Sequence, residues 1–241
     1  MLRNQIKSEF FKLIYHKGLL LTLVFSILFV LAMLLALNPS ASIINRDFIV
    51  TQFLQSIYLV QTIFAVFSAM FWGQEFLKST LRTSLLANPN RLKFFCMKST
   101  VTLFSILCCF CIAIGIGIGL VSFYFKFQLN LEFVRQLLLK LIPPMIATIQ
   151  ISMITLCLTI LMESIVSSLI IVLSMLLGLG QLLLQYSSRM NVLPVLATMN
   201  SFTIEPISFY PNVTEGIFIQ TVWMIVFIGL AYYHLHRKSV K

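Results

Sequence analysis

The strongest constraint in this sequence is the presence of six apolar stretches, each long enough to cross a lipid bilayer. They occupy approximately residues 18–37, 48–72, 99–125, 137–162, 165–186 and 216–233. About 20 apolar residues cross the hydrocarbon layer as a helix, and a helix satisfies its own backbone hydrogen bonds there. The sequence therefore predicts an all-α membrane protein, with one transmembrane domain over 1–241 and six spans.

Composition supports this prediction. Hydrophobic residues make up 59% of the chain, charged residues 10%, and the mean hydropathy is +0.99. Soluble domains carry about 25% charged residues. The chain therefore has the composition of a multi-pass membrane protein.

The distribution of basic residues predicts the orientation in the membrane. An even number of spans places both termini on one side, and the side richer in Lys and Arg faces the cytosol. The side of the termini collects twelve of the 17 basic residues: Arg3, Lys7, Lys12, Lys17, Lys78, Arg82, Arg91, Lys93, Lys98, Arg237, Lys238 and Lys241. The other side has Arg46, Lys126, Arg135, Lys140 and Arg189. We therefore expect both termini in the cytosol. The net charge of +10 is explained by this asymmetry and by contact with anionic lipid, so it does not require a nucleic-acid partner.

Residues 1–17 predict an amphipathic helix at the membrane surface. The apolar residues Leu2, Ile6, Phe10, Leu13 and Ile14 recur at helical spacing, with basic residues around them. Such a helix lies in the interface and does not cross the bilayer.

Two spans carry a stripe of polar residues at helical spacing. In the second span the stripe is Thr51, Gln55, Tyr58 and Thr62, and in the fifth it is Ser167, Ser174, Gln181 and Gln185. A polar stripe in a span faces protein or water in place of lipid. The stripes are candidates for lining a shared polar path, and hydrogen bonding between helices is the alternative.

Glycine and proline positions give three further predictions. Gly115 and Gly119 form a small-residue face in the third span, which predicts close helix packing. Pro143 and Pro144 are expected near the beginning of the fourth span, where a missing amide donor is tolerated. Between the fifth and sixth spans, residues 187–215 combine prolines with apolar residues, which predicts short helices that dip into the outer leaflet.

The segment 74–98 between the second and third spans predicts a short cytosolic amphipathic helix. Leu81 and Leu85 lie on its apolar face, Glu75 can pair with Lys78, and Pro89 ends the helix. An element of this kind lies on lipid or docks on a soluble partner.

This segment resembles the first cytoplasmic loop of permease subunits of type-2 ABC exporters. The resemblance lies in Glu75, in the run from Ser79 to Leu86, in 89–91 and in Lys98, with Ser79 where glycine is usual and Asn90 where a basic residue is common. It implies an N-terminal elbow helix, a cytosolic coupling helix, and re-entrant helices before the last span. The residues implied to dock on the ATPase are Glu75, Lys78, Thr80, Leu81, Arg82, Leu85, Pro89 and Arg91.

The resemblance also implies partners and a location. Two copies of a separate ABC ATPase, which carry the ATP and Mg, would act on this chain and on a second permease copy or a homologous permease. The expected location is the bacterial cytoplasmic membrane.

The sequence contains no nucleotide-binding loop, metal-ligand cluster or nucleophile with its base, so we expect no catalytic residue, metal site or bound cofactor. The function implied by the resemblance is export of an amphipathic cargo, an antimicrobial or toxin peptide. A drug or lipid efflux permease and a membrane sensor or scaffold without transport activity are the alternatives.

Overall fold

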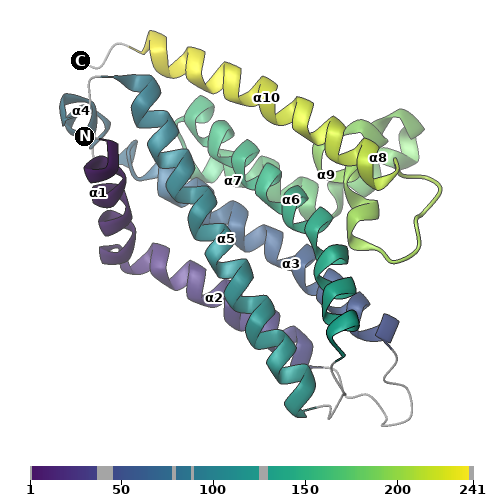
Figure 1. Ribbon diagram of the computed structural model, residues 1–241. Helices are drawn as coiled ribbons and strands as arrows, with labels where there is room; N and C mark the ends of the chain where they lie inside the picture. Colours follow the sequence, from purple (N-terminus) through teal and green to yellow (C-terminus); the bar gives the residue numbers. More distant parts are fainter. Residues whose placement is uncertain (1, 37–45, 78–79, 88–89, 125–129, 239–241) are drawn as a thin grey trace.

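The computed structural model describes residues 2–36, 46–77, 80–87, 90–124 and 130–238, and within these ranges the chain is helical, without a strand (Figure 1). Six helical segments are long and apolar enough to cross a membrane. They are α2 (Lys17–Leu35), α3 (Arg46–Gly73), α5 (Arg91–Tyr124), α6 (Leu131–Met162), the segment from α7 (Ile165–Ser174) to α8 (Gly180–Tyr186), and α10 (Val213–Arg237). The predicted all-α fold with six helical segments long and apolar enough to cross a membrane is confirmed for the described residues.

Two helices begin earlier than predicted. The third span was expected from residue 99 but α5 begins at Arg91, and the fourth was expected from 137 but α6 begins at Leu131. An apolar run marks only the part of a helix that lipid surrounds, and both helices continue beyond it into polar sequence. Pro143 and Pro144 consequently lie inside α6, and their predicted place near its beginning is wrong.

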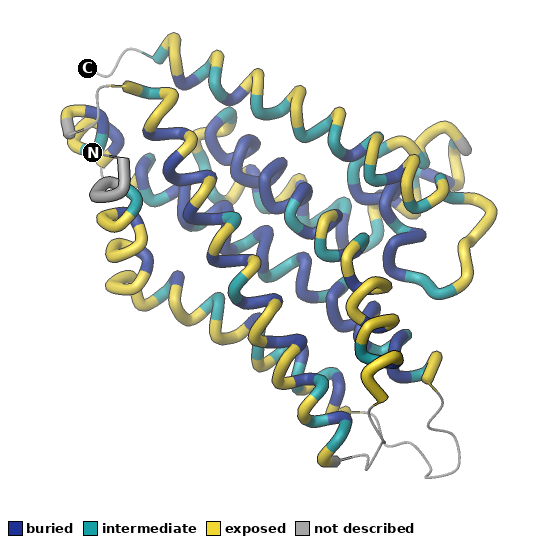
Figure 2. Tube along the Cα trace, in the orientation of Figure 1, coloured by how far each residue is buried: buried dark blue, intermediate teal, exposed yellow. Residues whose placement is uncertain are grey.

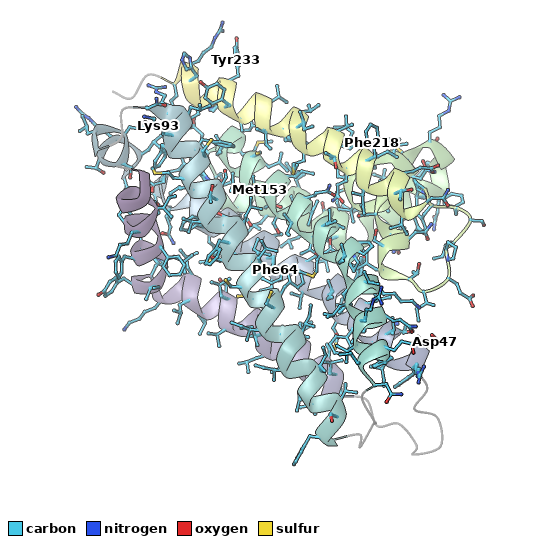
Figure 3. The ribbon with its side chains drawn as sticks, viewed as in Figure 1. Asp47, Phe64, Lys93, Met153, Phe218 and Tyr233 are labelled. Carbon is cyan, nitrogen blue, oxygen red and sulfur yellow. The ribbon has the colours of Figure 1, made fainter. Side chains whose placement is uncertain are left out.

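Helices α3 and α6 form the centre of the bundle. In the most apolar window of each span, 61% of α3 and 72% of α6 is buried, against 11% of α10. Figure 2 shows the buried residues concentrated on these central helices, while α10 lies along the outside of the bundle. Phe64 and Met153 lie in the interior, and Asp47 lies at the opposite end from Lys93 and Tyr233 (Figure 3).

The chain begins with a separate helix, α1 (Leu2–Tyr15), which bends into α2 at His16 (Figure 1). The His16 Nδ1 atom accepts the Leu19 N–H at 3.3 Å and caps α2. Leu13 packs into the core, whereas Phe10 and Ile14 stay exposed. A helix that precedes the first span is therefore present, and its position in the membrane interface stays a prediction.

Glycine packing differs from the prediction for the third span. A Cβ atom at Gly115 or Gly119 would meet nothing within 4 Å among the described residues, so the prediction that they pack closely is wrong for the described part of this chain. The close approach occurs at Gly117, where a Cβ atom would lie 2.9 Å from Leu34 and Phe53. Residues two apart on a helix point in different directions, so Gly117 faces the core while its neighbours face outward.

The fifth span is interrupted by a five-residue π-helical segment, η2 (Met175–Leu179). Gly178 has a φ of 130° there, a conformation that glycine adopts without the clash of a side chain.

Three short helices connect α8 to α10: η3 (Ser188–Val192), α9 (Pro194–Ala197) and η4 (Met199–Phe202). Asn200 fixes the following loop, because its side-chain amide donates to the carbonyls of Ile207, Tyr210 and Pro211 at 2.9–3.2 Å. The predicted short helices are present, and their entry into the outer leaflet stays a prediction.

Candidate functional site

Helix α4 (Thr80–Ala87) lies across the end of the bundle where α3 ends and α5 begins (Figure 1). Leu81 and Leu85 are buried, with 5% and 9% exposed, in a cluster that contains Trp72 and Phe94. The Thr80 hydroxyl donates to the Gln74 carbonyl at 2.8 Å. The apolar face of α4 is therefore seated on its own bundle.

This placement corrects one prediction. Leu81 and Leu85 were expected to fill a groove on a partner protein, but their side chains already fill the interior of this chain. The outward face of α4 presents Arg82, Thr83 and Leu86 instead, and 75% of Leu86 is exposed. Helical spacing identified the apolar face correctly without showing what that face contacts.

A cluster of four charged residues lies beneath α4, and we call it the ion cluster: Glu9, Lys12, Glu75 and Lys98. The Lys98 Nζ atom lies 2.7 Å from Glu75 Oε1. The Lys12 Nζ atom lies 2.6 Å from Glu9 Oε1 and 3.9 Å from Glu75 Oε1. Two carboxylates and two ammonium groups thus balance in charge and join α1, the loop after α3, and α5.

Lys98 is nearly inaccessible, with 2% of its side chain exposed. Its ammonium also donates to the Phe71 carbonyl at 3.1 Å, near the end of α3 where the helix dipole favours a cation. The rings of Phe71, Trp72 and Phe94 lie 4.9–5.7 Å from Nζ, within the range of cation–π attraction. A buried charge with these partners holds the ends of three helices together.

Glu75 is held ionised by its neighbours. Burial raises the pKa of its carboxyl group, but the Lys98 ammonium, the Ser84 hydroxyl and Lys12 outweigh burial, and the pKa lies below its ordinary value. Ser84 belongs to α4 and donates to Glu75 Oε2 at 2.7 Å. The ion cluster is therefore linked directly to α4.

A second set of contacts ties the end of α10 to the same end of the bundle. Arg91, the first residue of α5, donates through Nη1 to the carbonyls of Leu235, His236 and Lys238, the last two at 2.9 and 2.8 Å. Glu163, in the turn between α6 and α7, pairs with His234 and Lys238. The end of α10 is therefore tied to the start of α5 and to the turn before α7 at the α4 end of the bundle.

Two predicted docking residues, Lys78 and Pro89, lie outside the described residues, and so does the predicted pairing of Glu75 with Lys78. Arg91 is turned toward α10, so it supports the chain's own structure. Among the predicted docking residues, Thr80 and Arg82 are exposed.

The first polar stripe is largely satisfied within the chain. The hydroxyls of Thr51 and Thr62 donate to carbonyls of their own helix. The Tyr58 hydroxyl donates to the Leu176 carbonyl at 3.2 Å and so joins α3 to the fifth span. Gln55 is exposed.

In the second stripe, too, the hydroxyl groups have hydrogen-bond partners within the chain while the amide side chains are exposed. The Ser174 hydroxyl donates to the Ile171 carbonyl and Ser167 donates to Ser164. Gln181 and Gln185 line an open hollow of about 590 Å³ with Leu184, Ile207, Phe209 and Tyr210. The two stripes therefore do not enclose a path within one chain, and Gln55, Gln181 and Gln185 are the exposed amides that remain candidates.

Sequence reasoning missed the ion cluster, although each of its residues is visible in the sequence. The signal was the position of Lys98 directly beside an apolar run, because a charge at such a place needs a partner. The identity of that partner depends on packing between elements far apart in sequence.

Comparison of this chain with protein-family models, with curated proteins and with solved structures finds no match.

Proposed function

We propose that this chain is the membrane-spanning permease subunit of an ATP-driven ABC exporter. It would form half of a pathway for an amphipathic peptide, with a second permease copy or a homologous permease as the other half. Two copies of a separate ATPase would bind ATP and Mg and act on α4. The resemblance of residues 75–98 to the coupling loop of such permeases is the starting point.

The observation that carries the proposal is the linkage of α4 to the helix ends beneath it. The Ser84 hydroxyl of α4 binds the Glu75 carboxylate, which in turn binds Lys98 of α5. Separating buried charges from their partners costs about 3–5 kcal/mol. A force on α4 would therefore move α1, α3 and α5 with it, which is the property a coupling helix requires.

The exposed face of α4 is suited to contact with a partner. Burying an apolar side chain such as Leu86 contributes about 1.5–3 kcal/mol, whereas an exposed ion pair through Arg82 contributes about 0–1 kcal/mol. Leu86 is accordingly the proposed anchor, and Arg82 orients the contact.

The substrate class is supported by the exposed amides. Gln181 and Gln185 lie on a hollow that also has aromatic and apolar walls, a mixture that suits an amphipathic molecule. Drug or lipid efflux would use the same surfaces. A membrane sensor or scaffold is the alternative without transport.

The proposal is tested by searching for an ABC ATPase reading frame beside the gene for this chain, co-purifying the two proteins, and measuring ATP-dependent peptide transport in liposomes. Leu86→Asp is expected to weaken retention of the ATPase at least tenfold, as about 1.4 kcal/mol corresponds to a factor of ten. Leu131→Asp, an exposed leucine at the opposite end, is the matched control. Full retention and normal transport by Leu86→Asp would remove α4 as the docking element.

Orientation is tested separately by cysteine labelling in a background without native cysteines. Cysteines introduced at the exposed positions by Thr83→Cys and Arg189→Cys are expected to react from opposite sides of the membrane, with position 83 reacting from the cytosol. Reaction of position 83 with an impermeant reagent added outside would reverse the proposed topology.

A further inference from the structure

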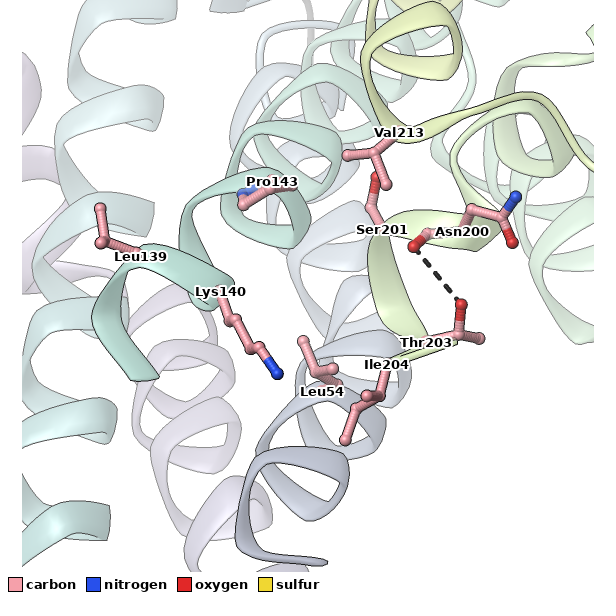
Figure 4. A pocket seen from close by; sticks show the side chains of 9 residues that line it. All are labelled: Leu54, Leu139, Lys140, Pro143, Asn200, Ser201, Thr203, Ile204 and Val213. Carbon is pink, nitrogen blue, oxygen red and sulfur yellow. Dashed lines mark hydrogen bonds between the residues drawn. The ribbon is translucent and has the colours of Figure 1, made fainter. Parts of the chain in front are cut away.

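A hollow of about 310 Å³ lies between α3, α6, η4 and the start of α10, at the end of the bundle away from α4 (Figure 4). Its walls are mostly apolar. The lining residues are Leu54, Leu139, Lys140, Pro143, Asn200, Ser201, Thr203, Ile204 and Val213. Its volume falls at the lower end of the range of ligand pockets, about 300–1,000 Å³.

Two groups in this hollow can donate to an anion. The Lys140 side chain extends across it toward Leu54 and Ile204 (Figure 4), and Lys140 has no acidic partner within 4 Å among the described residues. The Ser201 residue is 4% exposed, and its hydroxyl has no hydrogen-bond partner in the described part of the chain. A buried hydroxyl without a partner is costly, and a ligand that accepts its hydrogen bond removes that cost.

The depth of Lys140 matches the edge of the bilayer. From Lys140 to Met162, where α6 ends, the helix rises about 33 Å at 1.5 Å per residue. The hydrocarbon layer is about 30 Å thick. With Met162 at one boundary, Lys140 lies at the level of the headgroups on the other.

An apolar groove adjoins the hollow and shares Leu139 with it. The groove runs between α5 and α6, has a volume of about 570 Å³, and includes Gly115, whose missing side chain leaves it open. The Leu139 side chain, 56% exposed, forms the ridge between the two sites. An anion site at headgroup depth beside an apolar groove fits a molecule with an anionic head and a long apolar chain.

We propose that the Lys140 hollow binds the phosphate headgroup of an acidic phospholipid, whose acyl chain passes over Leu139 into the groove between α5 and α6. The Lys140 ammonium and the Ser201 hydroxyl donate to the phosphate oxygens. This site is independent of the proposed transport function, since it requires neither α4 nor an ATPase.

The test is native mass spectrometry of the purified full-length chain in detergent, titrated in parallel with phosphatidylglycerol and phosphatidylcholine. Both lipids carry a phosphate, but phosphatidylcholine also carries a quaternary ammonium, and repulsion between that cation and the Lys140 ammonium is enough for a preference of about tenfold. We expect the wild type to bind phosphatidylglycerol about tenfold more tightly than phosphatidylcholine. Lys140→Met should abolish this preference, Lys140→Arg should keep it, and Ser201→Ala should reduce it.

The matched control is Arg189→Met, which removes an exposed cation at the same end without touching the hollow, and which should leave the preference unchanged. An equal affinity for the two lipids in the wild type would overturn the proposal, as would an unchanged preference in Lys140→Met. Displacement of phosphatidylglycerol by millimolar inorganic phosphate would also overturn it, because the hollow would then recognise a free anion and not a lipid.

Discussion

The Lys98 ammonium of α5 lies 2.7 Å from the carboxylate of Glu75, and 2% and 6% of these side chains are exposed. The pair lies directly beneath α4 and connects it to α3 and α5 through Ser84 and Phe71. Four predictions follow from this arrangement and from the packing around it.

Breaking the Lys98–Glu75 pair should destabilise the protein strongly. Lys98→Met leaves a buried carboxylate without its main partner, and Glu75→Gln leaves a buried ammonium in the same position, so each should cost about 3–5 kcal/mol. The double variant should cost clearly less than the sum, because neither charge remains. Thermal unfolding in detergent measures the stability of the two single variants and the double variant, and Glu132→Gln, at an exposed position, is the control. Additive losses would mean that the two residues act separately.

Stability should depend on pH through Glu75. Because the pKa of Glu75 is lower in the folded protein than its ordinary value of 4.5, its stabilisation is present above pH 4.5 and is lost as the pH falls through the folded pKa. The wild type should therefore lose more free energy of unfolding below pH 4.5 than Glu75→Gln does. Unfolding temperatures from pH 7 to pH 3 measure this difference, and parallel curves would contradict the ionised state of Glu75.

Arg91 should control the end of α10. Its guanidinium binds three backbone carbonyls there, which the helix itself leaves without donors. Arg91→Gln should speed amide hydrogen exchange at residues 232–238 at least tenfold, from the loss of about 1.5–3 kcal/mol of charged hydrogen bonding. The exposed neighbour Lys93→Gln is the control and should leave exchange unchanged. Equal exchange in both variants would show that the end of α10 is held without Arg91, by the Glu163 pairs and by apolar contacts.

Two glycines of α10 should respond oppositely to alanine. A Cβ atom at Gly216 would lie 1.9 Å from the Ala197 carbonyl oxygen, so Gly216→Ala forces α9 away from α10. We expect Gly216→Ala to lower the free energy of unfolding by about 1–3 kcal/mol. At Gly229 a Cβ atom meets nothing within 4 Å in the part of the chain that the structure describes, and alanine should stabilise the helix by up to about 1 kcal/mol. Unfolding temperatures of the two variants decide the matter, and a tolerated Gly216→Ala would contradict the close packing of α9.

The six long apolar helices, the separate first helix, the short helix at Thr80–Ala87 and the short helices before α10 could all be predicted from the amino-acid sequence. These features follow from local properties: the length of an apolar run, helical spacing, and the prolines that interrupt it. Their boundaries were less predictable, because α5 and α6 continue past their apolar runs.

Which face of each helix meets which neighbour became visible only in the packed bundle. Leu81 and Leu85 were correctly placed on one face, but only packing against Trp72 and Phe94 showed that this face points inward. Helical spacing suggested a pairing of Glu75 with Lys78, which lies outside the described residues, but it did not indicate the contact of Glu75 with Lys98, on the next long helix. Contacts between distant residues depend on how the helices pack together, which helical periodicity in one segment does not specify.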